Sequence, residues 1–250
     1  MATKTSYRIR NLLRARGYEI VRSEQSSNLL ALHLSHLLPR YGINCVLDVG
    51  AREGEFGWWL RGTGFTGRIV SYEPISAHVS TLRALAEKDG NWEVRPYALG
   101  AEDTTAALNV TRLTHFSSFR EPGELAATSF AQETSIVGRP EVAVHRLDGV
   151  FDDAVAGIDD PRVYLKLDTQ GWDLEVLRGA EGCLDRVTAL QSEMSFRALY
   201  VDMPSFAEAW DAVSGYGFEM SGIFPITVGR DMRLIEADTV AVRPGGMCHP

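Results

Sequence analysis

The sequence has few features of a disulfide-bonded, membrane-spanning or nucleic-acid-binding protein. Its 250 residues include only three cysteines and no Cys-x-x-Cys pair, which argues against a disulfide framework or a cysteine-rich zinc site. No run approaches the ~20 consecutive apolar residues that a membrane span needs, and no apolar stretch follows the basic N-terminus as in a secretory signal. A net charge of -8 repels nucleic acids and anionic bilayers. We therefore expect a cytoplasmic protein with no nucleic-acid partner and no stable membrane insertion.

The chain also lacks internal repeats, low-complexity tracts and long linkers, so one main domain is expected. Helices are predicted at residues 3–16 and 26–38, with Pro39 ending the second. We accordingly divide the chain into an N-terminal helical cap at residues 1–40 and a main domain at residues 41–250. We expect the cap either to cover a pocket or to form a homodimer contact, and both alternatives remain open at this point.

Strands and helices alternate regularly through the main domain. Such alternation predicts an α/β fold with a doubly wound, mostly parallel sheet covered on both faces. The last two strands are expected to form a C-terminal antiparallel pair. A long loop at residues 112–139 is more often functional than idle. The predicted strands cover residues 44–49, 68–72, 92–96, 105–111, 141–146, 163–167, 187–193, 216–223 and 239–242, and the helices residues 55–61, 76–88, 173–178 and 205–214.

The first predicted strand of the sheet leads into a glycine turn. In a doubly wound sheet, ligands bind at the carboxyl ends of the strands, and Gly50 permits close approach of the backbone there. We expect a nucleotide-like cofactor against Gly50, Ala51, Arg52 and Glu53. A dinucleotide fingerprint requires a second glycine where Arg52 stands. The carboxylate of Asp48 also suits a cofactor with a cationic amine better than one with a pyrophosphate.

A second carboxylate follows the next strand, in the sequence Tyr72-Glu73-Pro74. Glu73 lies close to the ~20-residue spacing at which an acidic side chain binds ribose hydroxyls. Pro74 restricts the backbone conformation directly after Glu73, which favours a fixed position for that side chain. An amino group near Asp48 and a ribose near Glu73 together favour S-adenosylmethionine over NAD.

A third carboxylate, Asp168, follows the strand at residues 163–167 and is expected at the same edge of the sheet, where it contacts the cofactor together with Asp48 and Glu73. Here the chain resembles the FkbM-like family of S-adenosylmethionine-dependent methyltransferases, over about residues 44–242. The resemblance is carried by Leu47-Asp48-Val49-Gly50-Ala51, Tyr72-Glu73-Pro74, Ala98-Leu99-Gly100, Leu165-Lys166-Leu167-Asp168-Thr169-Gln170-Gly171-Trp172-Asp173 and Val176-Leu177-Arg178-Gly179-Ala180.

This resemblance implies a class I methyltransferase (Rossmann-like) fold. It also implies S-adenosylmethionine as cofactor, S-adenosylhomocysteine as product, and O-methylation of a hydroxyl on a sugar or secondary metabolite. Ala98 and Leu99 join the expected cofactor contacts. Family members commonly have Asn where Arg52 stands and an acidic residue where Gln170 stands.

Methyl transfer to a hydroxyl needs a general base within hydrogen-bond reach of the acceptor. Asp168 is the first candidate, and His115, in the long loop, is the second. Ser117 and Ser118 of that loop, and Glu193 at the end of the next strand, are expected to contact the small hydroxylated acceptor.

Three alternatives remain open from the sequence. Asp168 and Glu193 are suitable oxygen ligands for a divalent cation, but hard-cation sites need further oxygens that the sequence does not identify. An NAD-linked oxidoreductase and a non-catalytic cofactor-binding regulatory protein are the other two. The sequence does not identify the methyl acceptor.

Overall fold

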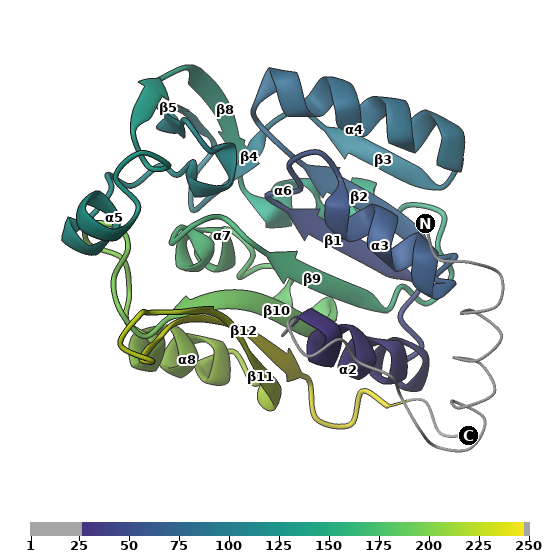
Figure 1. The fold of residues 1–250 in the computed structure, drawn as a ribbon. Helices are drawn as coiled ribbons and strands as arrows, with labels where there is room; N and C mark the ends of the chain where they lie inside the picture. Colours follow the sequence, from purple (N-terminus) through teal and green to yellow (C-terminus); the bar gives the residue numbers. More distant parts are fainter. Residues whose placement is uncertain (1–26, 248–250) are drawn as a thin grey trace, which may run out of the picture.

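The computed structural model describes residues 27–247. Its centre is a seven-stranded sheet with the strand order β11-β12-β10-β9-β1-β2-β3 (Figure 1). The strands are β1 (Cys45–Val49), β2 (Arg68–Tyr72), β3 (Trp92–Arg95), β9 (Val163–Leu167), β10 (Val187–Ser195), β11 (Glu219–Val228) and β12 (Leu234–Val242).

Helices cover both faces of this sheet and pack into two separate hydrophobic cores. Side chains alternate across a strand, so Cys45, Leu47 and Val49 of β1 join one core, and Val46 joins the other. Asp48 therefore lies on the same face as Val46. One core is formed with α6 (Leu147–Val155), α7 (Asp173–Arg178) and α8 (Phe206–Gly215), and the other with α2 (Ser27–Arg40), α3 (Glu55–Thr63) and α4 (Ser76–Asp89).

The strand directions confirm the predicted α/β architecture. β1 pairs in parallel with β2 and β9, and β9 pairs in parallel with β10. β12 is antiparallel to both of its neighbours, β10 and β11. The carboxyl ends of β1, β2, β9 and β10 consequently meet at one edge of the sheet.

A smaller region lies beside that edge (Figure 1). It holds a three-stranded sheet in the order β4-β8-β5 and a two-stranded sheet of β6 and β7. The predicted strand at residues 105–111 is thus wrong in extent, since β5 and β6 divide it, and residues 112–139 contain short elements rather than one loop. The elements are β4 (Ala98–Leu99), β5 (Thr104–Ala107), β6 (Val110–Thr111), a 3-10 turn (Thr114–Phe116), α5 (Glu124–Ser129), β7 (Ile136–Gly138) and β8 (Glu141–His145).

Several predicted boundaries also need correction. The helix α2 passes through Pro39, and Tyr41 N still donates to Leu37 O at 3.0 Å. β11 runs through Pro225, which an edge strand tolerates because no inner partner needs its missing N–H. The sequence also gave no prediction for α6. The predicted helix at residues 3–16 lies outside the described residues, and the division of the chain at residue 40 stays a prediction.

Candidate active site

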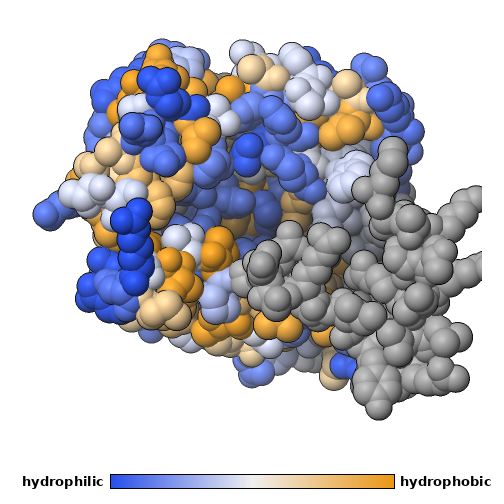
Figure 2. Space-filling view, viewed as in Figure 1, coloured by the Kyte–Doolittle hydropathy of each residue, from blue (hydrophilic) through white to orange (hydrophobic). Residues whose placement is uncertain are grey.

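A cavity of about 620 Å³ opens at the carboxyl ends of the parallel strands. Figure 2 shows it as a hollow with hydrophilic residues inside. This volume is within the range of about 300–1,000 Å³ that is usual for small-molecule sites. One wall contains Gly50, Ala51, Arg52 and Glu73, which we call the turn side. A second wall, which adjoins the first where Asp168 follows the neighbouring strand β9, contains Asp168, Glu193, Glu236 and Asp238, and we call it the acid side.

On the turn side, Gly50 lets two loops approach closely. Its φ is +79°, a conformation that only glycine adopts readily, and a Cβ there would lie 2.1 Å from the carbonyl oxygen of Asp168. The amides of Gly50 and Ala51 both donate to Tyr72 O, at 3.0 and 3.2 Å. They are therefore already bonded within the protein, and what Gly50 offers a ligand is close access to the backbone.

Glu73 is held in place by the backbone on both sides. Its two carboxylate oxygens accept from Arg52 N at 2.9 Å and Ile75 N at 2.8 Å. The residue is only 3% exposed yet lines the cavity. Since each carboxylate oxygen can accept a second hydrogen bond, Glu73 keeps acceptor capacity for a ligand hydroxyl. Pro74, Ala98 and Leu99 line the same side, whereas Glu53 is exposed and lies outside the cavity wall.

Asp48 lies beneath the cavity rather than in its wall. It is fully buried, and Lys166 Nζ lies 3.1 Å from its Oδ1. Burial raises the pKa of Asp48, and Lys166 acts in the opposite direction. The same ammonium lies 3.3 Å from Asp168 Oδ2. Lys166 thus joins two of the three predicted carboxylates and separates Asp48 from any ligand in the cavity.

Gln170 bridges the carboxyl groups of Asp168 and Glu193. Its Nε2 donates to Asp168 Oδ1 at 3.1 Å and to Glu193 Oε2 at 2.8 Å. Its Oε1 accepts from the Tyr200 hydroxyl at 2.8 Å. The backbone of Gln170 is in the left-handed region, with φ +53°, as is that of Arg52, with φ +48°.

The two bridged carboxyl groups have opposite pKa shifts. Burial works to raise the pKa of Asp168, but Lys166 and its hydrogen bonds outweigh burial and lower it. Burial and the nearby carboxylates, Glu236 first among them, raise the pKa of Glu193 well above its usual range. Asp168 is therefore the ionised member of the pair, and Glu193 retains its proton more readily.

Two further carboxyl groups of the acid side come from β12, Glu236 and Asp238. The predicted strand began at residue 239 and left both out. Their signal in the sequence is the alternation Ile235-Glu236-Ala237-Asp238-Thr239, which places both acids on one face of a strand. Lys166 was likewise missed, although it interrupts an otherwise apolar strand.

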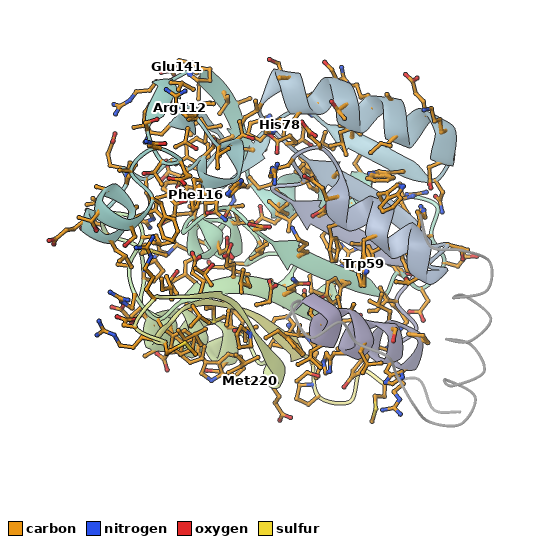
Figure 3. The ribbon with its side chains drawn as sticks, in the orientation of Figure 1. Trp59, His78, Arg112, Phe116, Glu141 and Met220 are labelled. Atoms are coloured by element: carbon orange, nitrogen blue, oxygen red, sulfur yellow. The ribbon has the colours of Figure 1, made fainter. Side chains whose placement is uncertain are left out.

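The predicted loop residues are brought to the cavity, but two of them have structural bonds. Ser118 Oγ donates to Gln170 O at 2.7 Å, and Ser117 Oγ accepts from Thr111 N at 3.2 Å. His115 also lines the cavity, and burial, followed by the charge of Arg52, lowers its pKa. Figure 3 places the neighbouring Phe116 between the smaller region and the main sheet.

Among residues 27–247, no group of three His, Cys, Asp or Glu side chains is arranged to hold a metal ion. The amide nitrogen of Gln170 lies between Asp168 and Glu193, and an N–H donor is no metal ligand. Nor is any helix within that range long and apolar enough to cross a membrane.

In a comparison with models of known protein families, one family matches this sequence. A model of the methyltransferase FkbM domain matches residues 48–220. None of the curated proteins matches the sequence significantly.

Solved structures with similar backbones are distant in sequence. An rRNA methylase from Streptococcus thermophilus has 11% identity and a TM-score of 0.45, with 89% of this chain and 99% of that chain covered. The magnesium protoporphyrin IX methyltransferase of Synechocystis PCC 6803, with bound S-adenosylmethionine, has 10% identity and a TM-score of 0.46, with 97% and 98% covered.

Proposed function

Because the chain belongs to the FkbM family of methyltransferases, which use S-adenosylmethionine, we propose that it methylates a hydroxyl oxygen of a small acceptor, such as a sugar or secondary metabolite. The strand order and the antiparallel β12 are those of the class I methyltransferase fold. Family membership overturns the alternative of an NAD-linked oxidoreductase. The observation that carries the proposal is that the turn side and the acid side line the same cavity.

The turn side fits the methyl donor. Glu73 has acceptor capacity for ribose hydroxyls, and Gly50 keeps side-chain atoms away from the ligand. Leu99 and Ile75 add apolar surface for a purine ring. We assign Gly50, Ala51, Arg52, Glu73, Pro74, Ala98 and Leu99 to cofactor binding.

When bound, S-adenosylmethionine supplies an electrophilic methyl group on a positively charged sulfur. Asp168, ionised through its pairing with Lys166, stabilises positive charge in the cavity. Asp48 supports this arrangement indirectly by fixing the ammonium of Lys166.

The acid side also receives the proton of the acceptor. The new C–O bond forms as the C–S bond breaks, with the electron pair of that bond going to sulfur, and the hydroxyl proton must leave. As the C–O bond forms, that proton becomes strongly acidic, so a carboxylate of lowered pKa suffices as the base. We assign Asp168 this role and Glu193 the positioning of the hydroxyl through a hydrogen bond. His115, kept neutral by its lowered pKa, is the alternative base.

Two measurements test this proposal. Calorimetry should show binding of S-adenosylmethionine and none of NAD. Mass spectrometry of hydroxylated glycosides and polyketides, incubated with enzyme and S-adenosylmethionine, should show a gain of one CH₂ unit located on oxygen. Absence of S-adenosylmethionine binding, or a methyl group found only on carbon or nitrogen, would contradict the proposal.

A further inference from the structure

The acid side holds more carboxyl groups than the Lys and Arg side chains of the described residues pair with. Among residues 27–247, no Lys or Arg nitrogen lies within 4.0 Å of the carboxyl groups of Glu193, Glu236 or Asp238. The ammonium of Lys166 is already paired with Asp48 and Asp168. Buried carboxylates are normally paired with a cation.

Glu236 faces the cavity with little to bind it. The residue is 6% exposed and lines the cavity. Its contact with Ser195 Oγ is 3.5 Å long, beyond the usual 2.5–3.0 Å of an O–H···O bond, and the Thr227 hydroxyl is its other hydrogen-bonding neighbour. A nearly buried carboxyl group is thus directed at a space that a ligand can fill.

Asp238, in contrast, is held in a fixed position. Gln191 Nε2 donates to Asp238 Oδ1 at 2.8 Å, and the buried Tyr164 hydroxyl donates to Gln191 Oε1 at 2.7 Å. This chain of bonds orients the carboxyl group without supplying a positive charge. Such orientation favours ligand binding, because the side chain loses little further conformational entropy when the ligand binds.

An aromatic side chain completes the same wall. Phe224 of β11 is the register partner of Asp238 of β12, and both line the cavity. Aromatic rings attract cations through their negative faces. Two carboxyl groups beside a phenyl ring are a suitable environment for an ammonium group and a poor one for an anion.

We propose that the methyl acceptor carries a protonated amine as well as the hydroxyl that is methylated, and that Glu236, Asp238 and Phe224 bind this amine. The inference rests on the proposed function, since it assigns the substrate class of the same cavity. Amino sugars, aminocyclitols and amino alcohols belong to this class. Neutral polyols are the competing class of acceptor, and a comparison of matched amine and neutral acceptors distinguishes the two classes.

The repulsion within the cluster supports this inference. Burial first, and then Asp168 and Asp238 among its neighbours, raises the pKa of Glu236 to about 7. Burial likewise raises the pKa of Asp238 to about 6, with Asp168 and Asp173 adding to the effect and Lys166 opposing it. A bound ammonium relieves this repulsion, so its binding is expected to release protons.

The experiment uses matched acceptor pairs that differ in one group. Glucosamine and glucose, galactosamine and galactose, and 2-deoxystreptamine and its hydroxyl-for-amine counterpart are each incubated with the full chain and S-adenosylmethionine at pH 7, where the amines are protonated. Mass spectrometry measures kcat/KM for methylation. We expect the amine to exceed its neutral counterpart by at least about tenfold, which corresponds to about 1.4 kcal/mol.

The double variant Glu236→Gln/Asp238→Asn tests the residues. It should raise KM for the amines by about tenfold or more, with a smaller effect on kcat, and should leave the affinity for S-adenosylmethionine unchanged. Glu219→Gln, at an exposed position of β11, is the matched control. Equal or better methylation of the neutral members, no methylation of any member by enzyme that binds S-adenosylmethionine, or an unchanged preference in the double variant would overturn the inference.

Results that contradict the proposed function differ from those that contradict recognition of the amine. Lack of S-adenosylmethionine binding contradicts that function, whatever the acceptor. A methyl group located by fragmentation on nitrogen rather than oxygen contradicts O-methylation and still supports recognition of the amine.

Discussion

The turn side and the acid side of the cavity are built in different ways. On the turn side, Glu73 is fixed by two backbone amides, and Gly50 fits its neighbour because it has no side chain. On the acid side, Asp168, Glu193 and Asp238 are fixed by the side chains of Lys166, Gln170 and Gln191. Fixation by the backbone, as on the turn side, suits a cofactor that is the same in every catalytic cycle. Fixation by side chains, as on the acid side, allows the preferred acceptor to change when a single side chain is exchanged.

The largest effect is expected from a substitution that breaks the turn side. Gly50→Ala places a Cβ against the carbonyl oxygen of Asp168 and forces a left-handed backbone on alanine. Binding of S-adenosylmethionine, measured by calorimetry, should fall below detection. Gly62→Ala, in α3 with no atom within 4 Å of the added Cβ, should leave binding unchanged. Normal affinity in Gly50→Ala would show that close packing of the two loops is dispensable.

The next largest effect is expected from the acid side. Asp168→Asn keeps the shape but removes the carboxylate that we propose as the proton acceptor, so kcat should fall by about 10²–10⁴-fold. Affinity for S-adenosylmethionine should change much less. Rapid-quench single-turnover measurements check the chemical step, and Asp159→Asn, at an exposed position, is the control. A normal rate for Asp168→Asn, together with a collapse for His115→Ala, would move the base to the loop.

A smaller effect is expected when one atom on the turn side is changed. Glu73→Gln replaces an acceptor oxygen by an NH₂ group, which cannot accept from the backbone amide facing it. The substitution also removes the charge that strengthens the hydrogen bonds from the ligand hydroxyls to Glu73. Loss of a charge-assisted bond to the ligand costs about 1.5–3 kcal/mol, so Kd for S-adenosylmethionine should rise roughly 10–100-fold. Equilibrium dialysis gives this Kd, with exposed Glu87→Gln as the control. Unchanged affinity would remove Glu73 from the cofactor site.

The pH dependence of stability distinguishes the two sides further. Glu236 has a pKa raised from 4.5 to about 7 in the folded chain, so between these values the folded state binds more protons than the unfolded state. Stability should therefore fall as the pH rises from 4.5 to 7, by a contribution on the order of 3 kcal/mol. Denaturant unfolding across this range measures the loss, and Glu236→Gln should reduce it. An equal or steeper loss in the variant would contradict the assignment.

Much of the turn side could be predicted from local sequence. The run Val46 to Gly50 and the sequence Tyr72-Glu73-Pro74 each signal a strand that ends in a functional turn, and all the information lies within a few residues. The parallel strands β2 and β9 were predicted with the bounds that the structure shows. Buried parallel strands are continuous apolar runs, which makes them easy to recognise.

The acid side could not be predicted in the same way. Glu236 and Asp238 reach the cavity because β12 is inserted between β10 and β11 in the sheet, and no local sequence pattern predicts that pairing. Lys166 gains its place between Asp48 and Asp168 only when β1 and β9 lie side by side. Sequence reasoning therefore placed Asp48 and Asp168 at the same edge but missed the lysine that joins them.

The side chain of Gln170 determines what kind of chemistry this cavity favours. Its amide is neutral at every accessible pH and donates to two carboxyl groups at once. An acid at the same position would set three negative oxygen ligands side by side, a set that hard cations prefer and that needs one to be stable. Exchange of the amide nitrogen for oxygen would thus turn a hydrogen-bonded pair of carboxyl groups into a cluster of three, and a single nucleotide change in a glutamine codon is enough for that exchange.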